Sequence, residues 1–311
     1  MLESFLIVGH QVAILFILIF IGFVCNKARL LTHEAVNGMT DLVLFVVTPC
    51  LIIHSFQREF NRQMLGALGL ALLIAVVLHL LNIVLAHTLV HDSYDRRRSV
   101  LRFALVFSNA GYMSIPLQKN LLGDDGVFYG AAVIAIFNIV LWSYGLVLMS
   151  GEARHMTAKK LIFNPGVLGV AIGVAFFVGS IKLPPLILEP MKALADLNTP
   201  LPMIIIGYYL ADAQLKNVFK DGRVYWVMFL RLVAVPLALL ALLLLANIRD
   251  QTMVVACVIA ASAPAAAATT MFSAKFNQDT ILSVGIVSYS TLLSLISMPL
   301  VVGLARYLTQ P

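Results

Sequence analysis

The sequence predicts an all-α membrane protein with ten transmembrane helices. Of its 311 residues, 61% are hydrophobic and only 12% are charged, and the mean hydropathy is +0.96. A soluble domain carries about 25% charged residues. The apolar residues also gather in runs close to the roughly 20 residues that a spanning helix needs. Backbone groups in hydrocarbon must bond internally, so helices are the expected form of these runs.

The predicted spans follow one another along the whole chain, and the seventh is the shortest. They cover residues 5–25, 36–56, 64–90, 100–122, 126–149, 164–181, 199–213, 221–246, 251–274 and 280–305. With the loops assigned alternately to two sides, 13 of the 21 Lys and Arg residues fall on one side, seven fall on the other, and Arg231 lies inside a span. The more positive side is expected to be cytoplasmic. We therefore expect a multi-pass plasma-membrane protein (bacterial inner membrane) with both termini outside. The scattered basic residues do not indicate a nucleic-acid partner.

The two halves of the chain resemble each other. A Thr-Pro pair stands at 48–49 and again at 199–200, and a second proline follows each pair, Pro116 after 67 positions and Pro264 after 64. Five spans per half is an odd number, so the second repeat would be inverted. Interrupted helices at matching positions of inverted repeats indicate the substrate site of a transporter. Two proline kinks that match by chance are the alternative.

The two later prolines predict broken helices. Proline lacks an N–H and clashes with the preceding turn, so we expect breaks at Pro116 and Pro264, with Ile115 pushed towards an extended conformation. Both positions are near the middle of their spans. A half-helix that starts after such a break has a partly positive end. Two such starts from opposite sides would form an anion site without a buried Lys or Arg.

Candidate substrate-binding residues surround these two breaks. Asn109 is the leading one because its amide can both donate and accept, although a side chain that satisfies freed backbone is equally compatible. Asn138 in the fifth span is second, with a hydrogen bond between helices as the alternative. The other candidates are Ser108, Gly111, Tyr112, Pro116, Ser262, Ala263, Pro264 and Thr269.

Two further residues are candidates for coupling or support. His79 in the third span could titrate near neutral pH, and a hydrogen-bonded core histidine is the favoured alternative. Arg231 lies about ten residues into the eighth span, where a charge costs about 2.5–3.5 kcal/mol. We expect it to pair with backbone carbonyls, with a carboxylate or with an anionic substrate.

Several chemistries are disfavoured. No Asp or Glu lies near a span centre, which argues against a proton or sodium antiporter. Cys25, Cys50 and Cys257 sit in apolar segments without paired spacing, so neither disulfides nor metal ligation are expected. No metalloprotease motif or phosphate-binding glycine loop is present. We expect no enzyme activity, no cofactor and no metal.

Four stretches resemble the auxin efflux carrier family, which includes bacterial permeases for small carboxylates. These are 48–52 (TPCLI), 107–117 (FSNAGYMSIPL), 198–211 (NTPLPMIIIGYYLA) and 262–276 (SAPAAAATTMFSAKF). The Asn-x-Gly-x-x-x-x-Pro pattern in the second stretch is the most specific feature, and the similarity in layout covers the whole chain.

The resemblance implies a secondary transporter. Each chain would contain two inverted five-helix repeats, and two chains would form a homodimer. Residues 1–60 and 151–215 would form a scaffold domain, and residues 61–150 and 216–311 would form a transport domain that moves against it like an elevator. The crossing broken helices would hold a small organic anion, a carboxylate. A sodium-coupled carrier of the related bile-acid-transporter type is the alternative.

Two departures from the plant members bear on the substrate. Only about 150–163 links the halves, where many plant carriers have a long hydrophilic loop, and 64–90 lacks the Asp and Lys that plant carriers keep on the third helix. These departures argue against auxin and favour a bacterial-type carrier of a small organic anion.

Overall fold

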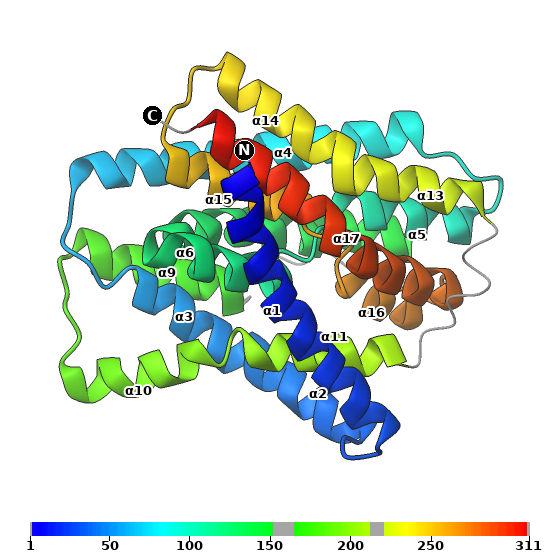
Figure 1. The fold of residues 1–311 in the computed structure, drawn as a ribbon, viewed down its shortest axis with the longest axis horizontal. Helices are drawn as coiled ribbons and strands as arrows, with labels where there is room; N and C mark the ends of the chain where they lie inside the picture. Colours follow the sequence, from blue (N-terminus) through cyan, green and yellow to red (C-terminus); the bar gives the residue numbers. More distant parts are fainter. Residues whose placement is uncertain (1, 152–164, 212–220, 310–311) are drawn as a thin grey trace.

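The computed structural model is helical almost throughout (Figure 1). It describes residues 2–151, 165–211 and 221–309. Within these ranges no β-strand occurs, and one isolated antiparallel bridge joins Ser108 to Ala265. The predicted linker over 150–163 lies almost entirely outside the described residues, as does the end of the span predicted over 199–213.

Fifteen α-helices are described, and short π-helical turns join some of them into longer ones. The first seven are α1 (Leu2–Lys27), α2 (His33–Leu42), α3 (Thr48–Ser55), α4 (Arg62–Leu89), α5 (Asp95–Val106), α6 (Ile115–Val140) and α7 (Leu146–Ser150). The others are α9 (Pro165–Val178), α10 (Pro185–Asp196), α11 (Pro200–Ala211), α13 (Gly222–Phe229), α14 (Val235–Leu245), α15 (Gln251–Ser262), α16 (Ala268–Lys275) and α17 (Thr280–Leu308). The π-helical turns cover Val43–Val47, Ala110–Ser114, Leu141–Gly145 and Leu230–Ala234.

Five continuous helical segments among the described residues are long and apolar enough to cross a membrane by length and composition. They are His33–Ser55, Arg62–Leu89, Ala110–Ser150, Gly222–Leu245 and Thr280–Leu308. Shorter apolar helices cover Val12–Lys27, Pro165–Val178 and Gln251–Ser262. Together they confirm an all-helical protein with several apolar helices, and the count of ten stays a prediction.

The longest of these segments is folded back on itself at Gly123. Gly123 has φ 66° and ψ −150°, a conformation that suits glycine. A Cβ placed on Gly130 would lie 2.8 Å from Cδ of Gln118, yet twelve residues of straight helix would separate the two by about 18 Å. The chain therefore reverses here, at the polar loop predicted between the fourth and fifth spans.

Contacts between helices connect all parts of the bundle. α1 packs against α11 and α17, and α3 packs against α9 and α10, whereas α6 packs against α4 and α15, and α17 against α15 and α16. In Figure 1, α2, α3, α10 and α11 occupy the lower part of the view, and α4, α5, α13 and α14 the upper part. The broken helices α5–α6 and α15–α16 pack against each other, α6 on α15 and α5 on α16.

Candidate functional site

The two interrupted helices cross and pair through their backbones. α5 ends at Val106, α15 ends at Ser262, and both chains then run extended for a few residues. The N–H of Asn109 donates to the carbonyl of Pro264 at 2.7 Å, and the N–H of Ala266 donates to that of Phe107 at 2.9 Å. The two interruptions therefore meet, and we call this paired region the crossover.

Pro264 lies in its break as the sequence predicts. Ala263, directly before it, is extended with φ −63° and ψ 147°, as the steric effect of the following proline ring favours. The amide of Ala265 finds a side-chain partner instead of a helical one, because it donates to Oγ of Ser290 on α17 at 3.2 Å.

The break predicted at Pro116 is wrong in position. The interruption lies at Phe107–Asn109, and Ile115 is helical with φ −60° and ψ −48°. Pro116 sits in the first turn of α6, where a missing N–H is tolerated. The π-helical turn Ala110–Ser114 before it shifts the hydrogen-bonding register, which accommodates the ring without a break.

Arg231 binds the carboxyl-terminal ends of both broken helices. It is 1% exposed, and its guanidinium donates to the carbonyls of Leu105 at 2.9 Å, Ala263 at 3.3 Å and Ala261. Nδ2 of Asn82 donates to the carbonyl of Val106 at 3.2 Å. Of the three partners expected for Arg231, the structure selects backbone carbonyls, which carry the partial negative charge of a helix end.

A cavity of about 300 Å³ opens on the other side of the crossover. Its wall includes Ala110 and Gly111 at the start of one half-helix, and Ala267 and Ala268 at the start of the other. Both partly positive helix starts therefore border the same hollow. We call it the crossover cavity. Its other lining residues are Phe45, Thr48, Ser108, Asn109, Tyr112, Ile134, Phe137, Asn138, Leu141, Trp142, Pro165, Gly166, Ala266, Met271, Phe272 and Lys275.

Asn109 is placed as a ligand donor would be. It lines the cavity and is 5% exposed, and its Nδ2 is buried without a hydrogen-bond partner among the described residues. A buried donor without a partner costs about 1–3 kcal/mol. Asn138 lines the same cavity but already donates to the carbonyl of Ile134 in its own helix at 2.9 Å. The two candidates are therefore not equivalent.

The structure divides the other predicted site residues into two groups. Ser108, Gly111 and Tyr112 line the cavity beside the two asparagines. Five others do not line it: Pro116, Ser262, Ala263, Pro264 and Thr269. His79 is also away from it, 3% exposed, with Nδ1 2.8 Å from the carbonyl of Ala75 in its own helix.

Several lining residues escaped the sequence analysis. Lys275 was counted only as a loop charge, yet it lines the cavity and forms no ion pair with a described residue. Trp142 and Phe272 form an aromatic wall with ring centroids 5.5 Å apart. Thr48 faces the cavity from α3; its place in the repeated Thr-Pro pair was the one signal that pointed to it.

The fold, with several long apolar helices, is that of a multi-pass membrane protein. The family model described as membrane transport protein matches residues 7–159 and 152–302. The chain therefore belongs to this family, the auxin efflux carrier type, and the resemblance is confirmed. A relative described as an uncharacterized transporter of Methanothermobacter thermautotrophicus is 26% identical over 298 residues, covering 91% of this chain and 94% of the relative.

Proposed function

We propose that this protein is a secondary transporter that moves a small organic anion, a carboxylate, across the plasma membrane. The observation that supports it best is the crossover cavity, where two half-helix starts and the unpartnered Nδ2 of Asn109 border one hollow. Such groups stabilise an anion without a buried lysine or arginine beside it. Membership of a transport family supports the carrier role.

The cavity also favours one kind of carboxylate. Its volume of about 300 Å³ is at the lower end of the range of ligand sites, about 300–1,000 Å³. Phe137, Trp142 and Phe272 give it an aromatic wall, and Lys275 supplies a positive charge at its edge. A compact monocarboxylate with an apolar body fits this lining better than a dicarboxylate does.

The proposed mechanism is elevator-like alternating access. We propose that each chain has ten transmembrane helices in two inverted repeats, with both termini outside, and that two chains form a homodimer. The contacts of Arg231 and Asn82 and the paired backbones of the crossover all fall inside 61–150 and 216–311, the ranges proposed for the transport domain. These contacts favour movement of the crossover as one body against the scaffold.

The sodium-coupled alternative is not favoured. An ion site at the crossover would need freed carbonyls, and those of Leu105, Val106, Ala261 and Ala263 already accept hydrogen bonds from Arg231 and Asn82. The guanidinium occupies the position that a cation would take. Replacing sodium by choline should leave uptake into proteoliposomes unchanged, and uptake that requires sodium would restore the alternative.

Trp142 offers a direct test of binding. The chain has two tryptophans, and Trp142 lines the cavity whereas Trp226 is exposed. In a Trp226→Phe protein, fluorescence should respond to butyrate and benzoate more strongly than to succinate, measured at one acidic and one neutral pH. Absence of a response to all three, together with absence of labelled uptake, would refute carboxylate transport.

Asn109→Ala should weaken benzoate binding in the same assay by about tenfold, the equivalent of about 1.4 kcal/mol. Asn138→Ala is the matched control, since its amide already has a partner in its own helix, and it should change the affinity much less. Equal affinity of the wild-type and Asn109→Ala proteins would remove Asn109 from the site.

A further inference from the structure

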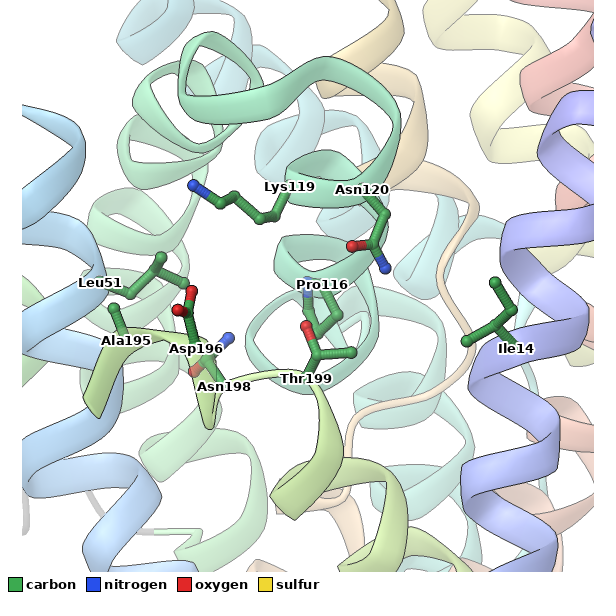
Figure 2. A pocket seen from close by; sticks show the side chains of 9 residues that line it. All are labelled: Ile14, Leu51, Pro116, Lys119, Asn120, Ala195, Asp196, Asn198 and Thr199. Carbon is green, nitrogen blue, oxygen red and sulfur yellow. The ribbon is translucent and has the colours of Figure 1, made fainter. Parts of the chain in front are cut away.

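A second hollow lies beside the first turns of α6. It has a volume of about 350 Å³ and is enclosed by α1, α3, α6 and the junction of α10 with α11 (Figure 2). We call it the Lys119 pocket. Its lining residues are Ile14, Leu51, Pro116, Lys119, Asn120, Ala195, Asp196, Asn198 and Thr199.

On α3, residues that line the two hollows lie less than one helical turn apart. Thr48 lines the crossover cavity and Leu51 lines the Lys119 pocket, and three residues of helix span about 4.5 Å. Oγ1 of Thr48 donates to Oδ1 of Asn198 at 2.9 Å. This hydrogen bond therefore joins a residue of one hollow to a residue of the other.

Asn198 has an unused donor at this boundary. The residue is 1% exposed, and its Nδ2 is buried without a hydrogen-bond partner among the described residues. Figure 2 shows the amide nitrogen directed towards the gap between Asp196 and Pro116. Asn109, which lines the crossover cavity, has the same buried and unpartnered group, so each hollow has one lining residue with an unused amide donor.

We propose that the Lys119 pocket is a second binding position for the transported carboxylate, with Asn198 as its donor, and that the Thr48–Asn198 hydrogen bond closes the passage between the two positions. This inference rests on the proposed function. In the predicted orientation, Lys119 and Lys275 face opposite sides of the membrane, so the two positions mark the two ends of one path.

The charges of the pocket predict weak binding there. Lys119 donates to the carboxylate of Asp124, which takes up part of its charge, and Asp196 on the same wall repels an anion. The Lys119 pocket should therefore hold the carboxylate less tightly than the crossover cavity does, as a position of entry or release requires.

The test compares two variants that add the same charge to the same pocket. Asn198→Asp keeps the acceptor for Thr48 but loses the donor, whereas Asn120→Asp changes a residue at the exposed rim. We expect Asn198→Asp to lower labelled benzoate uptake into proteoliposomes at least about tenfold, with the Trp142 response to benzoate unchanged as evidence of folding. Asn120→Asp adds its charge at the rim without removing a buried donor, and it should lower the uptake much less than Asn198→Asp does.

Thr48→Val provides a second readout if Asn198→Asp does not fold. Without the hydroxyl the passage is no longer closed, so benzoate efflux from loaded proteoliposomes should accelerate at least about twofold, a small change in barrier. Unchanged efflux here, or equal uptake by Asn198→Asp and Asn120→Asp, would overturn the second position alone. A wild-type protein that neither binds nor takes up benzoate, butyrate or succinate would instead overturn the proposed function.

Discussion

Arg231 resolves a problem that the crossover creates. Breaking two helices inside the membrane leaves carbonyl groups at both helix ends without their usual donors, and a lone buried charge is costly as well. In this protein the two costs offset each other, because the guanidinium presents several donors in one plane to carbonyls of both α5 and α15. Arg231 thus stabilises the crossover without lining the crossover cavity.

Arg231→Met should lower the stability of the purified protein, measured as the midpoint of thermal unfolding in detergent. Each buried carbonyl left without a donor costs about 1–3 kcal/mol. Arg231→Lys keeps the charge but has fewer hydrogen-bond donors, so its unfolding midpoint should lie between those of Arg231→Met and the wild type. A midpoint for Arg231→Met equal to the wild type would show that the carbonyls find other partners.

For single residues, the sequence predicted where a side chain lies along the chain better than it predicted which groups that side chain contacts. It placed Arg231 inside the protein, where the structure has it, but Asn109 lies within the interruption itself and not ahead of a break at Pro116. Which carbonyls Arg231 binds depends on residues 105 and 261–263 meeting in space, and no local pattern encodes that. Lys275 and Asn198 were missed for the same reason, since each joins its hollow through long-range packing.

At the scale of the elements, the backbones of α1 and α11 approach each other closely. A Cβ on Gly22 would lie 2.7 Å from Cα of Ile204, and a Cβ on Gly207 would lie 2.7 Å from the backbone N of Phe23. Neither helix backbone can move aside as a side chain would. Small residues at such contacts are what allow membrane helices to pack tightly.

Gly207→Ala should therefore force α1 and α11 apart and destabilise the protein by about 1–3 kcal/mol, as overpacking does. Gly66→Ala is the control, because a Cβ there meets nothing within 4 Å, and it should be neutral or slightly stabilising. The measurement is the unfolding midpoint of both variants side by side. Similar midpoints for Gly207→Ala and Gly66→Ala would mean that α1 and α11 can move apart at little cost in stability.

The sequence predicted the apolar helices well because hydropathy is a local property. It missed α10, whose 12 residues include Lys192, Glu189 and an internal Pro190, because that helix is too short and polar to resemble a span. It misplaced the break near Pro116 because proline is compatible with the first turn of a helix, and the residues that do interrupt the helix, Phe107–Asn109, are held extended by pairing with the distant segment after α15.

On the scale of the whole molecule, an ionic cluster joins three helix starts at one end of the proposed transport domain. The carboxylate of Asp92, 0% exposed, accepts from Arg223 at 2.7 Å and Arg97 at 3.3 Å, and Arg97 also pairs with Asp221 and Asp279. Burial alone would raise the pKa of Asp92, but the Tyr94 amide and the two guanidinium groups hold it below its usual value.

A lowered folded-state pKa makes the contribution of Asp92 to stability dependent on pH. The contribution is complete above the ordinary Asp pKa of about 3.9 and is lost as the pH falls through the lower folded value. Asp92→Asn should therefore lower the free energy of unfolding at neutral pH by about 1.5–3 kcal/mol, the value of hydrogen bonds to charged groups. Its unfolding midpoint should be lower than that of the wild type at neutral pH and equal to it in strong acid.

Asp95→Asn is the control for this pair, because the Asp95 side chain is 83% exposed and, among the described residues, pairs with Arg98 one turn away. Exposed pairs contribute about 0–1 kcal/mol. A gap between wild type and Asp92→Asn that is equally large in strong acid would assign the effect to packing instead of charge.

Each extended segment of the crossover accepts a hydrogen bond from a backbone amide of the other. The N–H groups of Asn109 and Ala266 are bonded to carbonyls across the pair, so deuterium from the solvent can replace these hydrogens only when the segments separate. A cycle that carries the crossover as one piece leaves both amides protonated through many turnovers. A transport cycle that separates the two segments would instead expose both amides to deuterium at each turnover. Deuterium exchange at Asn109 and Ala266 during transport therefore tells whether the crossover opens to release the substrate.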